Sequence, residues 1–180
     1  SRVVVCERQF LEHIRAAGGP VEHIVVADAD VKGTLTLEQL EAQADPAFDF
    51  DAAWRAVSPG DVVTLIYTSG TTGDPKGVEL THANVLAEIN MVTGQYGMRA
   101  GGRCVSYFPM AHIGERGQSQ YLAIMYRMQV TTVADPRAIA AALPDAKPTF
   151  LFTVPRVLEK LKAALEQEVA KGDGPRARLL

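Results

Sequence analysis

The sequence lacks the features that mark several broad classes of protein. Basic residues are not in excess, because 18 Lys and Arg stand against 21 Asp and Glu, and this balance argues against a nucleic-acid-binding surface. No apolar run approaches the roughly 18 residues that cross a bilayer, so we expect no membrane span. Cysteine is scarce as well: Cys6 and Cys104 both fall within apolar stretches. They predict buried, reduced thiols in a reducing compartment, not a disulfide scaffold.

What is present is the composition of an ordinary globular protein. Apolar residues make up 47% of the 180 residues and charged residues 22%, which disfavours disorder and fibrous repeats. The length suffices for one or two domains with a real core. The chain opens directly on the apolar run 3–6 and has no Met before Met91. We therefore expect an internal piece of a longer protein.

Short apolar runs alternate with helical patterns along most of the chain. This alternation is typical of βαβ units and predicts an α/β fold, with a mostly parallel sheet and flanking helices. The run 61–67 has no charge after its first residue, which predicts a strand covered on both faces. The remaining expected strands are 3–6, 23–27, 104–108, 130–133 and 149–154, and the expected helices are 10–17, 82–96, 118–128, 136–143 and 156–171. Residues 28–60 are expected to form a connecting arm with two short helices.

The most informative segment is the loop 68–77, which follows the strand 61–67. Its glycines let backbone N–H groups approach an anion, its hydroxyls can donate to phosphate oxygens, and its lysine adds a positive charge. A flexible surface turn is the alternative for such a composition. The candidate phosphate-binding residues are Thr68, Ser69, Gly70, Thr71, Thr72, Gly73, Lys76 and Gly77.

Two well-known phosphate motifs do not fit this loop. A Walker loop needs glycine before its lysine and Ser or Thr after it, whereas Pro75 precedes Lys76 and Gly77 follows it. The glycine spacing also departs from the G-x-G-x-x-G dinucleotide motif. The loop therefore belongs to another class.

The stretch Tyr67–Val78 resembles the signature loop of the AMP-forming superfamily of acyl-CoA synthetases, adenylation domains and luciferases. Residues 59–61 and 80–84 are similar to the flanks of that loop in the family. The resemblance implies that the chain lies in the large N-terminal domain of an adenylate-forming enzyme. It also implies that the loop binds the β- and γ-phosphates of ATP and follows the pyrophosphate as it leaves.

A second segment narrows the subfamily. Residues 107–116, Tyr-Phe-Pro-Met-Ala-His-Ile-Gly-Glu-Arg, resemble the corresponding stretch of long-chain fatty-acid–CoA ligases. The resemblance gives His112 a catalytic position near the acyl carboxylate and the α-phosphate; the alternative is a structural histidine at a helix N-terminus. We expect Glu115 and Arg116 to be structural and to find separate partners, since adjacent helical residues point to different sides.

The resemblance implies an ATP-dependent acid–thiol ligase as the full-length parent. Such an enzyme uses ATP with Mg²⁺ to convert a fatty acid to acyl-AMP, and then forms a thioester with coenzyme A. The alternatives are a fatty acyl-AMP ligase, an adenylation domain that loads a carrier protein, and a non-enzymatic nucleotide-binding module.

The family's motifs for adenine, ribose, Mg²⁺ and the catalytic lysine do not occur in the sequence, so we expect no metal ligands here and no turnover from residues 1–180 alone. We expect residues 1–58 to be a partial lead-in with the connecting arm, and residues 59–180 to carry the phosphate loop. The expected location is the cytoplasm, with peripheral membrane contact of the parent left open, and exposed apolar faces favour association between copies.

Overall fold

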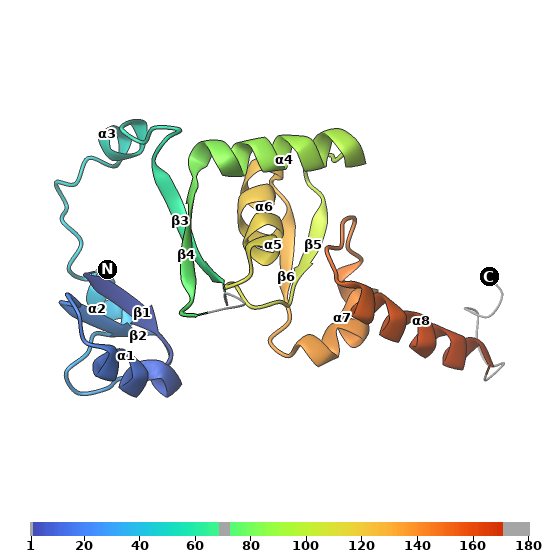
Figure 1. Cartoon of the computed structure of the whole chain (residues 1–180), viewed down its shortest axis with the longest axis horizontal. Helices are drawn as coiled ribbons and strands as arrows, with labels where there is room; N and C mark the ends of the chain where they lie inside the picture. Colours follow the sequence, from blue (N-terminus) through green and yellow to red (C-terminus); the bar gives the residue numbers. More distant parts are fainter. Residues whose placement is uncertain (1, 69–72, 171–180) are drawn as a thin grey trace. The chain divides into compact units, whose positions relative to one another are not determined.

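The computed structural model describes residues 2–68 and 73–170. The chain divides into two compact units, Ser1–Ala56 and Val57–Leu180, and each is described below by itself. Figure 1 shows the elements of both units with their labels.

The first unit is built on a βαβ motif. Strand β1 (Val3–Cys6) pairs in parallel with β2 (His23–Val26), and the connection between them carries η1 (Arg8–Phe10) and α1 (Leu11–Ala17). Leu11, Val25 and Val26 are buried, and they form the small interior of this unit. The arm that follows holds two short helices, α2 (Leu37–Glu41) and α3 (Phe50–Arg55), each with a side-chain N-cap.

The second unit contains two pairs of strands. Strand β3 (Val62–Thr68) and β4 (Lys76–Thr81) form an antiparallel hairpin across the glycine loop. Strands β5 (Arg103–Ser106) and β6 (Gln129–Thr132) pair in parallel. The helices of this unit are α4 (His82–Tyr96), α5 (Ile113–Arg116), the π-helix η2 (Gly117–Leu122), α6 (Ala123–Tyr126), η3 (Pro136–Ala138), α7 (Ile139–Ala146) and α8 (Pro155–Ala170).

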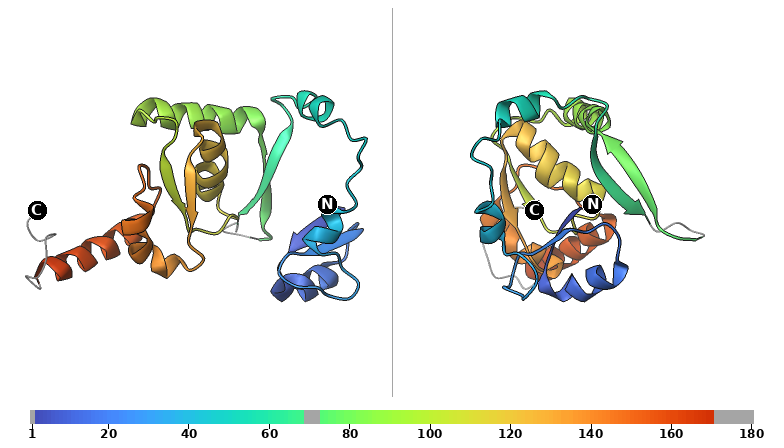
Figure 2. Two further views of the ribbon diagram at one scale, coloured as in Figure 1. Left: turned by 180° about the vertical axis from the view of Figure 1, so that it is seen from behind. Right: turned by 90° about the vertical axis from the view of Figure 1, so that its left-hand side faces the viewer.

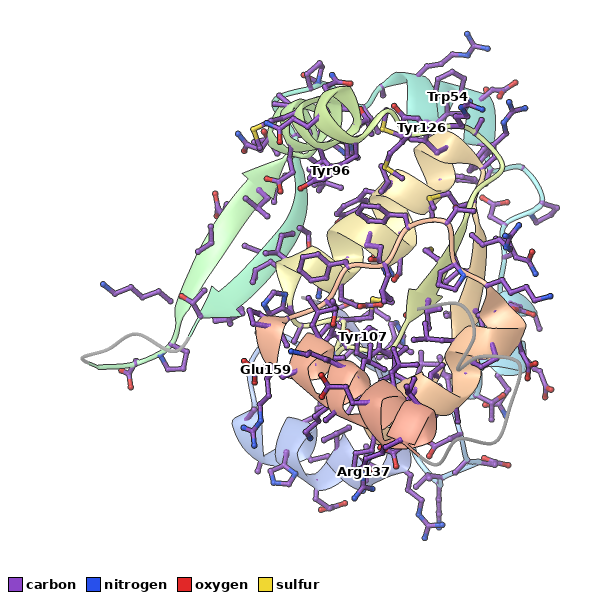
Figure 3. All side chains as sticks on the ribbon, turned by 90° about the vertical axis from the view of Figure 1, so that its right-hand side faces the viewer. Trp54, Tyr96, Tyr107, Tyr126, Arg137 and Glu159 are labelled. Carbon is purple, nitrogen blue, oxygen red and sulfur yellow. The ribbon has the colours of Figure 1, made fainter. Side chains whose placement is uncertain are left out.

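A continuous helical run, α5–η2–α6, lies between the β3–β4 hairpin and the β5–β6 pair (Figures 1 and 2). Hydrogen bonds fix it on the β5 side, because the buried Gln118 side chain donates to the Val105 carbonyl at 2.8 Å and accepts from the Phe152 N–H at 2.6 Å. Tyr107 lies in the interior (Figure 3), and its hydroxyl donates to Thr153 Oγ1 at 2.7 Å. The core cluster consists of Val105, Tyr107, Ile139 and Ala146.

The predicted α/β fold class is confirmed: strands and helices alternate except at the antiparallel β3–β4 hairpin, and the parallel pairs β1–β2 and β5–β6 are each connected through helices. The helix predicted over 82–96 has those bounds. The helix predicted over 118–128 instead begins at Ile113, because His112 caps a first turn there. No helix within residues 2–68 and 73–170 is long and apolar enough to cross a membrane.

The strand predicted over 149–154 is wrong. The backbone N–H groups of Thr149 and Phe150 both donate to the one carbonyl of Arg103, and the Phe152 N–H donates to the side chain of Gln118. A strand needs successive donors paired along a ladder, so this segment runs beside β5 without joining it as a strand.

The prediction that the strand over 61–67 is covered on both faces is also wrong for this chain. Ile66 is buried, but Leu65 is 48% exposed and Tyr67 is 69% exposed. Strand side chains alternate between two faces. The face of β3 that holds Thr64, Ile66 and Thr68 lies toward the helices, whereas the opposite apolar face has little cover among the described residues.

Candidate functional site

The hairpin β3–β4 presents the glycine loop. Thr68, the last residue of β3, pairs directly with Lys76, the first residue of β4, so the hydroxyl and the ammonium stand at the two ends of the loop. Both residues are exposed. Gly73 has a φ of 109°, a conformation that side-chain-bearing residues rarely adopt. The candidate residues Ser69, Gly70, Thr71 and Thr72 lie outside the described residues.

Gly77 belongs to β4 and lies opposite Tyr67 in the ladder. A Cβ at this position would stand 3.2 Å from Cζ of the Tyr67 ring. The aromatic ring therefore lies over the glycine backbone, and the close approach at Gly77 is to a side chain of its own hairpin.

Helix α4 follows β4 without a loop, and its first turn is closed by a capping box. Thr81 Oγ1 accepts from the Asn84 N–H at 3.2 Å, and Asn84 Oδ1 accepts from the Thr81 N–H at 3.0 Å. These bonds satisfy donors that a helix N-terminus otherwise leaves open. The hairpin and α4 are thereby joined end to end.

His112 caps α5. Its Nδ1 accepts from the Gly114 N–H at 3.1 Å, so in the neutral ring the proton is on Nε2, which can donate to a ligand. The imidazole is exposed and lies 6.4 Å from the Phe108 ring and 6.5 Å from the Phe152 ring, centroid to centroid. The position at a helix N-terminus is thus observed, and it leaves one ring nitrogen available.

Glu115 and Arg116 have separate partners, as predicted. Glu115 is fully buried; its carboxylate accepts from the Phe108 N–H at 3.3 Å and from the Ser119 hydroxyl at 2.5 Å. Arg116 Nε donates to the Met110 carbonyl at 2.5 Å, and its Nη1 donates to Thr64 Oγ1. The Glu115 side chain is thus buried, whereas the Arg116 side chain links the Met110 carbonyl to the side chain of Thr64 on β3.

The buried surroundings of Glu115 affect two neighbouring acids. Burial raises the pKa of the Cys104 thiol, and the negative charge of Glu115 adds to the shift. Burial also raises the pKa of the Tyr107 hydroxyl; its hydrogen bond to Thr153 opposes the shift, and Glu115 reinforces it. Both groups therefore stay protonated at neutral pH.

A cavity of about 400 Å³ lies between the hairpin, α4, the α5–η2 run and residues 150–152. Thr68 borders it at the end of β3, and Ile113 and Gly114 border it next to His112. Apolar side chains dominate the remaining lining, with a few polar groups such as Asn84 and Gln118. A mostly apolar cavity with few polar groups is typical of small-molecule sites.

Sequence reasoning missed this cavity and the Arg116–Thr64 contact. The signals were present: Thr64, Ile66 and Thr68 share a strand face by their period of two, and Gly117 and Tyr121 are four residues apart on one helix. Neither the strand spacing nor the helix spacing shows which strand packs against which helix. Within the described ranges, no three His, Cys, Asp or Glu side chains are grouped so as to hold a metal ion.

The model of the family "AMP-binding enzyme" matches residues 1–180. The chain belongs to this family. A Mycobacterium tuberculosis protein named as the fatty-acid–CoA ligase fadD11 is 56% identical over 140 residues, which are 77% of this chain and 24% of that protein. The long-chain-fatty-acid–CoA ligase FadD15 of the same organism is 37% identical over 151 residues, or 83% of this chain and 25% of the relative.

A solved structure gives the same family and fold. The long-chain-fatty-acid–CoA ligase FadD1 from Archaeoglobus fulgidus matches with a TM-score of 0.69 and 26% identity, over 93% of this chain and 33% of that chain. The family resemblance drawn from the glycine loop and the stretch around His112 is confirmed. The chain spans about a quarter of the length of the curated relatives that it matches.

Proposed function

We propose that this chain is the ATP-phosphate-binding part of an AMP-forming fatty-acid–CoA ligase. The observation that carries the proposal is the hairpin, which places the Thr68 hydroxyl and the Lys76 ammonium on paired residues at the two ends of the glycine loop. Hydroxyl and ammonium donors bind phosphate oxygens well. The mycobacterial relatives are named as fatty-acid–CoA ligases, which supports a fatty acid as the carboxylate substrate.

The proposed reaction has two steps. A carboxylate oxygen of the fatty acid attacks the α-phosphorus of ATP, the bond from this phosphorus to the oxygen shared with the β-phosphate breaks, and pyrophosphate leaves. The thiol sulfur of coenzyme A then attacks the acyl carbon, loses its proton, and releases AMP. ATP enters as its magnesium complex, so the metal arrives with the substrate.

Negative charge develops on the pyrophosphate during the first step, and fixed donors at the loop would stabilise it. We assign this role to Lys76 and to the hydroxyl and amide groups of the loop, namely Thr68, Ser69, Gly70, Thr71, Thr72, Gly73 and Gly77. We assign His112 Nε2 to the acyl carboxylate and the α-phosphate, because Nδ1 is already occupied by the Gly114 N–H.

We assign the apolar cavity to the acyl chain. It reaches from Thr68, at the start of the glycine loop, to Ile113 and Gly114, next to His112. A chain in the cavity would therefore have its carboxylate close to both the phosphates and the imidazole. Burial of each methylene contributes about 0.8 kcal/mol, which would favour long-chain acids.

The domain roles and the location follow the same proposal. Residues 1–58 serve as lead-in and connecting arm, and residues 59–180 as the phosphate-loop subdomain. The groups for adenine, ribose and Mg²⁺ and the catalytic lysine would come from other parts of the parent enzyme. The unpaired thiols Cys6 and Cys104 are consistent with a cytoplasmic enzyme.

The test is ATP–pyrophosphate exchange by the full-length protein with palmitate, with and without coenzyme A. We expect exchange that requires the fatty acid, and palmitoyl-CoA with AMP when coenzyme A is added. Exchange without thioester formation would identify an acyl-AMP ligase or a carrier-loading domain instead. ATP binding without exchange for any fatty acid tested would favour the non-enzymatic module and refute the proposal.

A further inference from the structure

Residues of α5 form hydrogen bonds with alternate residues of the loop 108–112. The Phe108 N–H donates to the Glu115 carboxylate, the Met110 carbonyl accepts from Arg116 Nε, and His112 Nδ1 accepts from the Gly114 N–H. The imidazole therefore takes its position from these bonds, because the backbone that carries it is fixed on both sides.

Arg116 also reaches in the other direction. Its Nη1 donates to the hydroxyl of Thr64, which lies on β3 four residues before Thr68. A single guanidinium thus bridges the strand that leads into the glycine loop and the loop that carries His112. Arg116 and Thr64 are both half-buried, so water competes less for these bonds than at the surface.

We propose that Arg116 is a positioning residue that sets the distance between the phosphate loop and His112. This inference rests on the proposed function, in which the phosphate loop binds the β- and γ-phosphates and His112 acts on the acyl carboxylate and the α-phosphate. The planar guanidinium suits the task, because its donors diverge at fixed angles and can serve a carbonyl and a hydroxyl at once. Arg116 itself would touch no substrate.

The expected size of the effect comes from the geometry of reaction. Misplacing a reacting group by about 1 Å costs on the order of 100-fold in rate. Loss of the Thr64 acceptor removes one charge-assisted bond but leaves the bond to Met110, so we expect a fall of roughly 10- to 100-fold in the rate of adenylate formation.

The chain offers matched variants for this test. Thr64→Val removes the hydroxyl with little change of shape, and Thr64→Ser keeps it. The control is Arg103→Met, since Arg103 Nε also donates to a backbone carbonyl, that of Lys147 at 2.8 Å, at the end of α7. Arg103 therefore reports what the loss of a comparable arginine does away from the hairpin.

The experiment measures ATP–pyrophosphate exchange with palmitate and amide hydrogen exchange of residues 108–114, both in the full-length protein. For Thr64→Val we expect a roughly 10- to 100-fold lower kcat, a palmitate KM within about threefold of wild type, and faster amide exchange in 108–114. Thr64→Ser should have the kcat of the wild type and the wild-type rate of amide exchange in 108–114. Arg103→Met should leave kcat and the exchange of 108–114 unchanged.

The outcomes separate this inference from the proposed function. Wild-type kcat in Thr64→Val, loss of kcat that serine does not restore, or an equal loss in Arg103→Met would each overturn the positioning role. If the wild-type protein shows no palmitate-dependent ATP–pyrophosphate exchange, the proposed function fails. Amide hydrogen exchange alone then decides whether the Arg116–Thr64 contact positions the loop 108–112. Faster exchange of 108–114 in Thr64→Val would then support the link, and unchanged exchange would overturn it.

Discussion

Gly114 is the position where the structure predicts the sharpest effect of a single methyl group. A Cβ there would lie 2.6 Å from Cζ and 2.8 Å from Cε1 of Phe152, and 3.2 Å from Nδ1 of His112. Gly114→Ala must therefore displace the Phe152 ring or the first turn of α5. The Phe152 ring is confined by the Phe108 ring, with centroids 6.2 Å apart. Displacing either the Phe152 ring or the first turn of α5 therefore destabilises the fold.

The magnitude follows from two contributions. Overpacking of this kind costs about 1–3 kcal/mol, and loss of the cap between His112 and Gly114 costs a further 0.5–2 kcal/mol, by the typical range of caps. The control is Gly117→Ala, because a Cβ at Gly117 meets nothing within 4 Å. Alanine is favoured over glycine in helices by about 1 kcal/mol, so this control should be neutral or stabilising.

Urea unfolding of the full-length variants, followed by tryptophan fluorescence and circular dichroism, measures both effects. We expect Gly114→Ala to lower the unfolding midpoint and Gly117→Ala to keep or raise it. Since a Cβ at position 114 also crowds Nδ1 of His112, Gly114→Ala should slow adenylate formation more than it weakens ATP binding. Equal midpoints for the two variants would refute the contact between position 114 and Phe152.

Three further predictions concern the groups around the site. Glu115→Ala should destabilise the protein by about 1–3 kcal/mol for each buried donor left unpaired. Glu115→Gln should destabilise it less, because glutamine keeps an acceptor oxygen, and urea midpoints compare the two variants. Thr81→Ala should cost about 1 kcal/mol through the lost cap of α4, whereas Thr81→Ser should retain most of it. The raised pKa of Cys104 stabilises the fold fully below the pKa of the unfolded thiol, about 8.5, and this contribution is lost as pH rises through the folded value. The midpoint should therefore fall above about pH 9, and Cys104→Ala should make that fall shallower.

Local features of the fold could be read from the sequence. Thr81 is followed by residues that favour a helix, and a capping box acts within four residues, so the bounds of α4 needed no tertiary information. The strands predicted over 3–6 and 23–27 were equally clear, because short apolar runs on either side of an amphipathic helix define a βαβ motif.

The predictions that were wrong concern features that depend on contacts between distant segments. Apolar side chains on both faces of residues 61–67 predict double cover, but cover requires other elements to be packed there. Residues 149–154 have strand-like composition, yet Gln118 and Arg103 take their hydrogen bonds. Composition cannot reveal such competition, because the partner is more than 30 residues away.

The residues of the candidate site could be proposed from the sequence, but their assembly could not. The sequence singled out Lys76 and His112 from two separate motifs. It also predicted that Glu115 and Arg116 find different partners. It could not identify Thr64 as a partner of Arg116, since a threonine within an apolar strand carries no mark of its neighbour. The link between the two motifs became visible only in three dimensions.

We propose above that the loop between Thr68 and Lys76 binds the phosphates of ATP during fatty-acid activation. The most direct measurement is ATP–pyrophosphate exchange by full-length Lys76→Ala at saturating palmitate, beside Lys160→Ala, which removes an exposed lysine of α8. A charge-assisted contact to phosphate contributes about 1.5–3 kcal/mol. We expect exchange to fall roughly ten- to a few hundredfold in Lys76→Ala, with a raised ATP KM and an unchanged palmitate affinity, and to stay at the wild-type rate in Lys160→Ala. Equal exchange rates for Lys76→Ala and wild type would contradict the claim and make the loop an ordinary surface turn.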